Sequence, residues 1–389
     1  MRIVHERDVI AVLDFGSQYS HLIVRRIREL GVFAELLSPE TPAEKLKGYA
    51  GVILSGGPQN LSESSALKAD HALYTLGIPL LGICYGLQLI AHELGGEVQA
   101  GEKREYGPAR VALSRRSPLF KGLSKNELTW MSHGDQVTKV PQGFIITGKS
   151  DACLIAAVEN TKRQIYGIQF HPEVRHTTHG MTVIRNFVRM TGARRTWRLG
   201  KGWIDNAVAD IRKTVRNGRA LCALSGGVDS TVAAFLVHRA IGSRLTCVYV
   251  DTGLMRRGET EQIKKTFSKL PKIDFRVINA EKEFLKALNG VTEPERKRKI
   301  VGGLFIRLFE AEAKKSKVKS QKLKVRFLVQ GTLYTDAITS GVSVGGKAAV
   351  IKSHHNVGGL PKDVKFRLIE PLRDLYKDEV RALGRQLGV

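Results

Sequence analysis

The sequence predicts two α/β domains in tandem, and three observations lead to this fold class. The chain has 389 residues, which is enough for about two to three domains of the usual size. Apolar runs that end at Gly-rich turns alternate with helical patterns, as in a sheet flanked by helices. A basic, Gly-rich stretch at residues 191–202 interrupts this alternation, which then starts again. We therefore expect one domain over residues 1–193 and a second over residues 200–389.

The first domain is expected to contain a mixed sheet. Three short apolar runs predict buried strands at residues 9–13, 51–54 and 79–83. Apolar residues spaced three or four apart predict helices at residues 22–30 and 87–94. Shorter apolar runs separated by turn residues fill positions 97–170. This last pattern predicts antiparallel strands added to the same sheet.

The second domain is expected to contain a parallel sheet, because its strands and helices alternate strictly. The predicted strands are 220–224, 245–250, 275–278 and 326–330. The predicted helices are 203–215, 231–240, 259–270 and 377–387. Residues 314–326 carry six lysines and one arginine. Such a charge run predicts an exposed loop.

The composition excludes several classes of protein. No stretch approaches the ~18 consecutive apolar residues of a membrane helix, and the N-terminus lacks the apolar core of a secretion signal. The four cysteines lie far apart in the sequence, which excludes a disulfide scaffold and a CxxC zinc ribbon. We expect a cytoplasmic protein without a membrane partner.

Charge is distributed unevenly along the chain, whose formal net charge is +25. Residues 1–193 hold 22 basic and 18 acidic side chains, whereas residues 194–389 hold 40 basic and 19 acidic ones. This excess predicts that the second domain binds a polyanion. A solvated basic surface would explain the composition equally well.

A cysteine and a histidine stand where a nucleophile and its base would be expected. Cys84 lies between Gly82 and Gly86, at a turn from an apolar strand into a helix. This context exposes a side chain at the sheet edge, and the helix N-terminus favours the thiolate. His171 and Glu173 follow another apolar run. Because residues two apart on an extended chain face the same side, Glu173 would orient His171 toward the sulfur.

A Gly-rich loop in the second domain predicts a phosphate site. Residues 225–230 read Ser-Gly-Gly-Val-Asp-Ser between a predicted strand and a predicted helix. Glycines let the backbone approach phosphates, hydroxyls add donors, and the helix N-terminus favours negative charge. The carboxylate of Asp229 fits such a place if a Mg²⁺ ion bridges it to the phosphates.

The first constellation resembles the class I glutamine amidotransferases. The similar motifs are Gly82–Gln88, Gln169–Glu173 and Ser55–Pro58. The resemblance implies that Cys84 attacks the side-chain amide of glutamine, forms a thioester and releases ammonia, with His171 and Glu173 completing the triad. It also implies that backbone N–H groups of Gly57 and Tyr85 hold the oxyanion. The residues implied to hold the glutamine are Gln88, Ser132, Gly134 and Asp135.

The second constellation resembles the PP-loop of the ATP pyrophosphatases, which cleave ATP between the α- and β-phosphates. The resemblance implies that the loop and the start of its helix grip the departing pyrophosphate, and that Val250 lies against adenine. The ATP-binding residues so implied are Ser225, Gly226, Gly227, Val228, Asp229, Ser230, Thr231 and Val250.

Taken together, the chain resembles the glutamine-hydrolysing GMP synthetases over nearly its whole length. The further segments that carry the resemblance are Asp14–Tyr19, Ser132–Asp135, Lys297–Ile300, Gln330–Thr332, Ile351–Pro361 and Glu370–Val380. The resemblance implies that MgATP adenylates xanthosine monophosphate (XMP), and that ammonia from the first domain then displaces AMP to give GMP. It places Lys352, His354 and His355 on a lid over these nucleotides.

The sequence departs from this family in places, which leaves alternatives open. We expect the family's C-terminal dimerisation domain to be absent, so the chain could be an incomplete subunit that a separate polypeptide completes. Thr252, Thr335 and Thr339 replace the family's usual residues. The third alternative is a PP-loop protein that binds or modifies RNA. Such a function would explain the basic charge of the second domain but would not need the cysteine.

Overall fold

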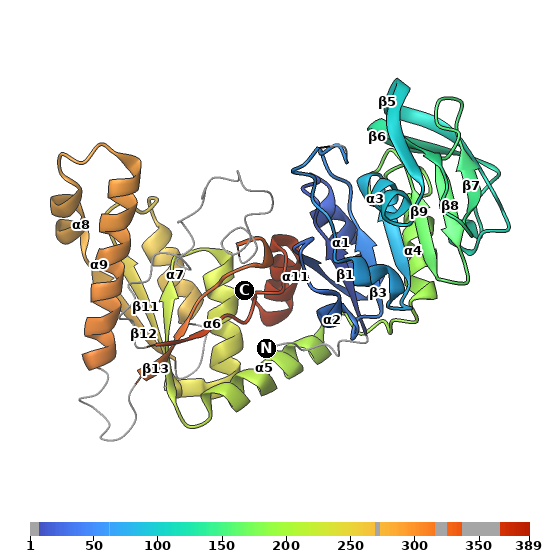
Figure 1. The fold of residues 1–389 in the computed structure, drawn as a ribbon. Helices are drawn as coiled ribbons and strands as arrows, with labels where there is room; N and C mark the ends of the chain where they lie inside the picture. Colours follow the sequence, from blue (N-terminus) through green and yellow to red (C-terminus); the bar gives the residue numbers. More distant parts are fainter. Residues whose placement is uncertain (1–7, 62, 269–272, 316–324, 337–365) are drawn as a thin grey trace. The chain divides into compact units, whose positions relative to one another are not determined.

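The structure is a computed structural model that describes residues 8–61, 63–268, 273–315, 325–336 and 366–389. These residues form two compact units, which meet in the sequence between Arg198 and Leu199 and are drawn in Figure 1. Within the described part of the chain, none of the helices combines the length and the apolarity needed to cross a bilayer.

The first unit is built on a nine-stranded sheet of order β2-β1-β3-β4-β9-β8-β7-β5-β6. The strands are β1 (Val9–Leu13), β2 (Phe33–Leu37), β3 (Gly51–Leu54), β4 (Leu80–Ile83), β5 (Glu97–Leu113), β6 (Asn126–Lys139), β7 (Ile145–Lys149), β8 (Ala157–Asn160) and β9 (Ile165–Ile168). The pairs among β2, β1, β3, β4 and β9 are parallel, and the remaining pairs are antiparallel. The predicted mixed sheet is confirmed.

Helices cover this sheet through apolar faces. They are α1 (Ser20–Glu29), α2 (Ala43–Leu46), α3 (Tyr85–Glu93) and α4 (Gly180–Met190), with short 3₁₀ turns η2 (His71–Thr75) and η3 (Pro118–Phe120). Helix α1 packs against β2 and α4, whereas α3 packs against β3, β4 and β9. The α4 side chains Val183, Ile184 and Phe187 are buried, at the three- and four-residue spacing of an amphipathic helix.

The second unit is built on a parallel sheet of order β12-β11-β10-β13-β14. The strands are β10 (Arg219–Leu224), β11 (Leu245–Asp251), β12 (Asp274–Asn279), β13 (Val325–Val329) and β14 (Arg367–Ile369). The helices are α5 (Lys201–Val215), α6 (Val228–Ile241), α7 (Glu259–Phe267), α8 (Glu281–Leu288), α9 (Pro294–Lys315) and α11 (Lys377–Leu387), with the 3₁₀ turn η4 (Gly242–Arg244). Helices α5 and α11 contact α6, and α9 contacts α8 and β10.

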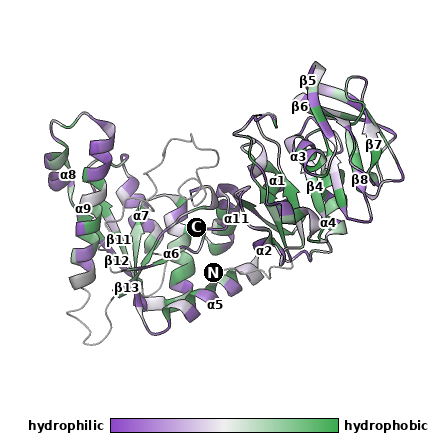
Figure 2. Cartoon of the chain, in the orientation of Figure 1, coloured by the Kyte–Doolittle hydropathy of each residue, from purple (hydrophilic) through white to green (hydrophobic). Residues whose placement is uncertain are grey.

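The central strands of both sheets are apolar, as their green colour in Figure 2 shows. All residues of β1 and β3 are buried, and so are Leu245–Val250 of β11. Parallel strands with helices on both faces need such continuous apolar runs rather than an alternating pattern. This explains why these strands were visible in the sequence.

Several elements differ from the prediction. Helix α6 begins at Val228 rather than Thr231, so part of the predicted loop is the first helical turn. The antiparallel region is dominated by the long ribbon of β5 and β6 rather than by short strands, and β9 pairs parallel to β4. The edge strands β2 and β14 and the helices α8 and α9 were not predicted. Lys314 and Lys315 end α9, Val325 and Arg326 begin β13, and the lysine-rich residues 316–324 lie outside the described part.

Helix α3 lies unusually close to the sheet because two glycines lack side chains. A Cβ atom on Gly86 would lie 2.4 Å from the carbonyl oxygen of Leu54 on β3, and one on Gly82 would lie 2.5 Å from the backbone of Gly86. Real Cβ atoms do not approach backbone so closely. The two glycines therefore set the depth at which α3 begins, and with it the position of Cys84.

We predict that Gly86→Ala destabilises the protein by about 1–3 kcal/mol, because the added methyl group overpacks the contact between α3 and β3. Gly202→Ala is the matched control, since Gly202 also lies in a helix but an added Cβ would meet no atom of the described residues within 4 Å. It should stabilise the protein by about 0.5–1 kcal/mol through helix propensity. Thermal unfolding monitored by circular dichroism measures both, and equal shifts for the two variants would contradict the steric account.

Candidate active site

The first site lies at the carboxyl edge of the parallel strands in the first unit. The segments that follow β1, β3, β4 and β9 contribute Gly16–Tyr19, Gly57–Asn60, Cys84 and His171 to one cavity of about 740 Å³. Strands β5 and β6 supply the rest of its lining, which is Ala100, Gly101, Arg104, Tyr106, Ser132, His133, Gly134 and Asp135, with Gln88 from α3. The fold thus brings the predicted nucleophile, base and binding residues to one place.

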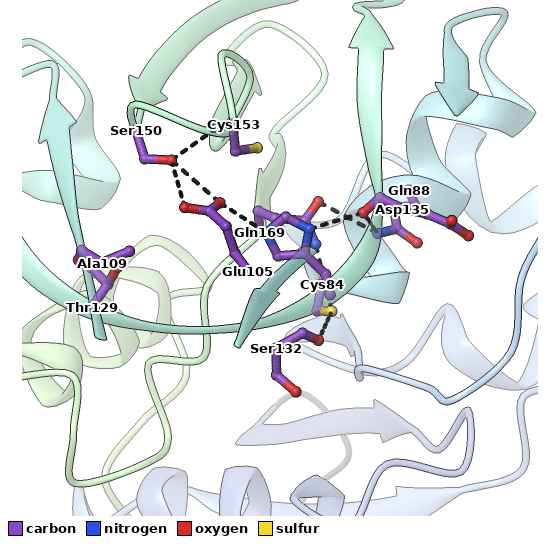
Figure 3. A network of polar contacts seen from close by, with 11 residues as sticks. Cys84, Gln88, Glu105, Ala109, Thr129, Ser132, Asp135, Ser150, Cys153 and Gln169 are labelled. Atoms are coloured by element: carbon purple, nitrogen blue, oxygen red, sulfur yellow. Dashed lines mark hydrogen bonds and ion pairs between the residues drawn. The ribbon is translucent and has the colours of Figure 1, made fainter. Parts of the chain in front are cut away.

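Cys84 occupies a strained turn between β4 and α3. Its φ is +53°, a value that non-glycine residues adopt rarely, and its side chain is almost fully buried. The sulfur lies 3.6 Å from the carbonyl oxygen of Ser132 and 3.5 Å from the side-chain nitrogen of Gln169 (Figure 3). Strain at a reactive side chain is typical of a nucleophile held in place by its surroundings.

His171 and Glu173 form a buried pair next to this cysteine. The Nδ1 atom of His171 lies 2.8 Å from Oε1 of Glu173, and both side chains are at most 4% exposed. A Cβ atom on Gly56 would lie 3.1 Å from Cε1 of His171 and 3.7 Å from Cβ of Cys84. The imidazole ring and the cysteine are therefore close to each other. The Tyr19 ring and the imidazole pack edge to face, with ring centroids 5.3 Å apart.

The surroundings of His171 favour its protonated form. Burial alone would lower its pKa, but the charge of Glu173 and the hydrogen bonds with Cys84 and Glu173 outweigh burial and raise the pKa well above its ordinary value. Since Glu173 faces Nδ1, the Nε2 atom is left to exchange a proton with the sulfur. The arrangement can therefore form a thiolate and an imidazolium, as nucleophilic catalysis by cysteine requires.

The residues expected to hold glutamine line the same cavity. Gln88, Ser132, Gly134 and Asp135 all contribute to its wall. The side-chain nitrogen of Gln88 donates to the carbonyl oxygen of Asp135 at 2.7 Å and lies 3.5 Å from Oε1 of Gln169. Gln88 thus fixes one wall of the cavity through its side chain.

Gly57 and Tyr85 are the two residues expected to supply backbone N–H donors to an oxyanion. Tyr85 is the first residue of α3, so its N–H has no partner within the helix. Its ring has a structural role, because it is buried and its hydroxyl donates to the carbonyl of Leu67 at 2.7 Å. A Cβ atom on Gly57 would lie 3.3 Å from the Tyr85 ring, which brings the two proposed donors, Gly57 and Tyr85, to the same side of the cavity.

The sequence analysis missed several residues of this site. Gln169 stood in a quoted motif without a role, although it is fully buried and touches the sulfur. Tyr19 likewise stood in a motif, and its packing against His171 depends on the fold. His133 stood in the Ser132–Asp135 motif without a role of its own, and Glu105 went unnoticed, because the pairing of strands β5 and β6 could not be read from the sequence.

A second site lies at the carboxyl edge of the parallel sheet in the second unit. Gly226 has a φ of +80°, and Gly227 caps α6. The hydroxyl of Ser225 accepts from the N–H of Gly227 at 3.3 Å and lies 3.2 Å from that of Ser230, while Thr231 donates to the carbonyl of Gly227 at 3.0 Å. These contacts hold the loop in a compact turn at the helix N-terminus, where anions bind readily.

The sheet order places this loop at a topological switch point. Numbered by their sequence order, the strands lie side by side as 3-2-1-4-5. Strands β11 and β12 are added on one side of β10, whereas β13 and β14 are added on the other, so the switch point lies between β10 and β13. The Ser225 loop follows β10, and Gln330–Thr332 follow β13. A Cβ atom on Gly331 would lie 2.8 Å from the backbone nitrogen of Ser230, so the two segments touch. Ligands of open α/β sheets bind in such crevices.

Asp229 and Lys377 form an ion pair beside the loop. The Nζ atom of Lys377, in the first turn of α11, contacts Oδ2 of Asp229. The other oxygen, Oδ1, is buried and has no hydrogen-bond partner among the described residues. An oxygen ligand is therefore available at the position expected for Mg²⁺. The sequence analysis had not assigned Lys377 a role.

The remaining predicted site residues are placed differently. Val250 is 2% exposed and packs in an apolar cluster with Val248, Ala280 and Phe284, so its side chain faces the core. An adenine ring would have to meet its backbone. The lid residues Lys352, His354 and His355, and Thr339, lie outside the described residues.

Two family models match the chain, and each covers one of the sites. The model described as Glutamine amidotransferase class-I matches residues 11–191. The model described as Thiamine biosynthesis protein (ThiI) matches residues 215–389.

Curated relatives match nearly the whole chain. The glutamine-hydrolyzing GMP synthase of Symbiobacterium thermophilum is 51% identical over 388 residues, which cover 99% of this chain and 74% of that protein. The enzymes of the same name from Geobacillus kaustophilus and Carboxydothermus hydrogenoformans are 51% and 50% identical, and the matches cover 98% of this chain and 74% and 73% of those proteins. With this identity across both sites, the chain belongs to the family of glutamine-hydrolysing GMP synthases.

Proposed function

We propose that the protein makes GMP from XMP, ATP and glutamine, with glutamine hydrolysis at Cys84 and adenylation of XMP at the Ser225 loop. The observation that carries the proposal is that Cys84 and His171 line one cavity and that Glu173 is paired with His171 behind it, on a chain whose relatives carry this activity in their names. The alternative of an RNA-binding protein does not account for this cavity.

We assign the two reactions to the two halves of the chain. Residues 1–193 contain the cysteine site and carry little net charge, which suits a small zwitterionic substrate. Residues 200–389 contain the loop at the start of α6 and most of the excess positive charge. That charge favours ATP, XMP and pyrophosphate, all of which are polyanions.

In the glutaminase reaction, His171 takes the proton of Cys84, and the thiolate attacks the side-chain amide carbon of glutamine. The oxyanion is held by the backbone N–H groups of Gly57 and Tyr85, a contribution of roughly 3 kcal/mol per donor. His171 then gives its proton to the leaving ammonia, and water hydrolyses the thioester to glutamate. Glu173 keeps the imidazole oriented throughout.

In the ligase reaction, the C2 oxygen of XMP attacks the α-phosphorus of ATP and pyrophosphate leaves. The N-terminus of α6 and the hydroxyls of Ser225, Ser230 and Thr231 would hold the pyrophosphate. The residues fit a Mg²⁺ ion, because Asp229, in the first turn of α6, has a buried carboxylate oxygen without a hydrogen-bond partner among the described residues. The ion would neutralise phosphate charge there, with Asp229 as its protein ligand. Ammonia finally displaces AMP from the adenylated XMP.

We predict that Cys84→Ala abolishes glutamine-dependent activity and leaves ammonia-dependent pyrophosphate release within about twofold of wild type, since only the first unit loses its nucleophile. Glutamate release and pyrophosphate release, measured with glutamine or with ammonium chloride, test this. Loss of the ammonia-dependent reaction as well would contradict the division of labour.

Asp229→Asn should have the reverse effect. Removing the carboxylate charge should lower XMP-dependent pyrophosphate release by at least about 100-fold, while glutamate release persists. Asp205→Asn is the matched control, because Asp205 is an aspartate on α5 whose side chain is 52% exposed. A full rate of pyrophosphate release in Asp229→Asn would rule out this residue as the Mg²⁺ ligand.

We predict that Glu173→Gln lowers the pKa of His171, because the charge that raises it is lost. The imidazolium would then lose its proton at lower pH, so the alkaline limb of kcat/KM for glutamine moves to lower pH. The maximal rate should also fall by about 100-fold, since the ring is less well oriented. A pH profile of glutamate release measures both effects, and an unmoved alkaline limb would refute the role of Glu173.

A further inference from the structure

A second buried His–Glu pair lies beside the proposed glutamine cavity, with its histidine in the cavity wall. Glu105 on β5 and His133 on β6 are directly opposite each other in the antiparallel ribbon. The Nε2 atom of His133 lies 3.2 Å from Oε2 of Glu105, and their side chains are 2% and 14% exposed, respectively. None of the steps described above uses this pair.

The hydrogen bonds of His133 fix where its protons lie. Its Nδ1 atom is 3.1 Å from the carbonyl oxygen of Asp135, which can only accept, so Nδ1 carries a hydrogen. In a neutral ring Nε2 would then have a lone pair, and an ionised Glu105 would present another lone pair to it. Two such atoms repel each other at 3.2 Å unless a proton lies between them.

The network continues on both sides of the pair. The hydroxyl of Ser150 donates to the carboxyl of Glu105 at 3.2 Å and accepts from the backbone N–H of Cys153 at 3.0 Å (Figure 3). On the other side, the carbonyl of Asp135 accepts from both His133 and the side chain of Gln88. A continuous chain of hydrogen bonds therefore runs from the loop at Ser150 to helix α3.

We propose that Glu105 and His133 share one buried proton and act as a positioning pair that holds the Ser132–Asp135 wall against Cys84 and Gln88. The carbonyl of Ser132 contacts the sulfur, and the carbonyl of Asp135 anchors Gln88. The pair thus acts on glutamine binding through this wall, without touching the reacting atoms. This inference rests on the proposed binding of glutamine in the cavity.

The surroundings of His133 favour a neutral imidazole ring. Burial lowers the pKa of His133, and the charge of His171 lowers it further. The charge of Glu105 and the hydrogen bonds to Asp135 and Glu105 raise this pKa, but they do not outweigh burial. A neutral ring with its hydrogen on Nδ1 needs a hydrogen-bond donor at Nε2, and the atom that faces Nε2 is Oε2 of Glu105. The carboxyl then donates to Nε2 and still accepts from Ser150.

A divalent cation is the competing occupant of this position. Ligand atoms of Glu105, His133 and Cys153 lie within 4.8 Å of one another, and a zinc ion takes such ligands. However, burial raises the pKa of the Cys153 thiol to about 12, which opposes the thiolate that zinc requires. We therefore assign a proton, rather than a cation, to the position between Glu105 and His133. A measurement of zinc binding tests the alternative.

Two substitutions of Glu105 separate positioning from packing. Glutamine can donate its amide N–H to Nε2 and accept from Ser150, so Glu105→Gln imitates the protonated carboxyl. Glu105→Leu has similar size but leaves Nε2 without a partner. Glu97→Leu is the matched control, because Glu97 lies on the same strand, is 51% exposed and pairs with Lys139 at the surface.

We expect Glu105→Leu to raise the KM for glutamine by at least about tenfold with kcat within about threefold, and Glu105→Gln to stay near wild type in both. Glutamate release at varied glutamine measures this. Equal KM values for Glu105→Gln and Glu105→Leu would overturn the proposal. If wild type and Glu97→Leu release no glutamate, the proposed function fails instead.

Two measurements do not depend on activity. In the protein with ¹⁵N-labelled histidine, we expect the signals of His133, assigned by their loss in His133→Phe, to show a neutral ring with its hydrogen on Nδ1. The same spectrum in Glu105→Gln supports the proposal, and an imidazolium in wild type contradicts it. Stoichiometric zinc in protein incubated with zinc chloride, absent from Cys153→Ser, would show that a cation takes the place of the proton.

Discussion

The proposed chemistry of the first unit depends on one steric constraint, the contact of α3 with the parallel sheet. Gly82 and Gly86 let the helix begin so close to β3 and β4 that no side chain fits between them. Cys84 is the residue left at the turn, with a positive φ that only its surroundings maintain. The same contact orients the N-terminus of α3, so the proposed nucleophile and one proposed oxyanion donor are placed together.

Around this turn, buried titratable side chains of the first unit are paired with each other. His171 is paired with Glu173, and His133 with Glu105, and both histidines line the same cavity. Burial disfavours the charged form of both histidines, but only His171 is compensated strongly enough for its pKa to rise above the ordinary value, while that of His133 falls. In two pairs of the same residue types, the pKa of the histidine is thus shifted in opposite directions, which suits His171 to proton transfer and His133 to its proposed role in holding a wall.

The fold and the site could be predicted from the sequence where the physical constraints act locally. Buried parallel strands such as β1, β4 and β10 are continuous apolar runs, and the turns at Cys84 and at Ser225 need glycines, so both left clear patterns. The ribbon of β5 and β6 could not be predicted, because its register follows from cross-strand pairing rather than from any local pattern. For this reason Glu105 and His133, which lie 28 residues apart in the sequence, were not connected. Helix α9 was missed because its charged residues obscure the apolar positions that pack against β10.

The central claim is that Cys84 is the nucleophile that takes the acyl group of glutamine. Rapid acid quenching of the enzyme during glutamine turnover, followed by proteolysis and mass spectrometry, tests this directly. The account predicts a glutamyl thioester on the peptide that contains Cys84, and none on those that contain Cys153, Cys222 or Cys247. A thioester on another cysteine, or steady glutamate release by Cys84→Ser without any adduct, would contradict it.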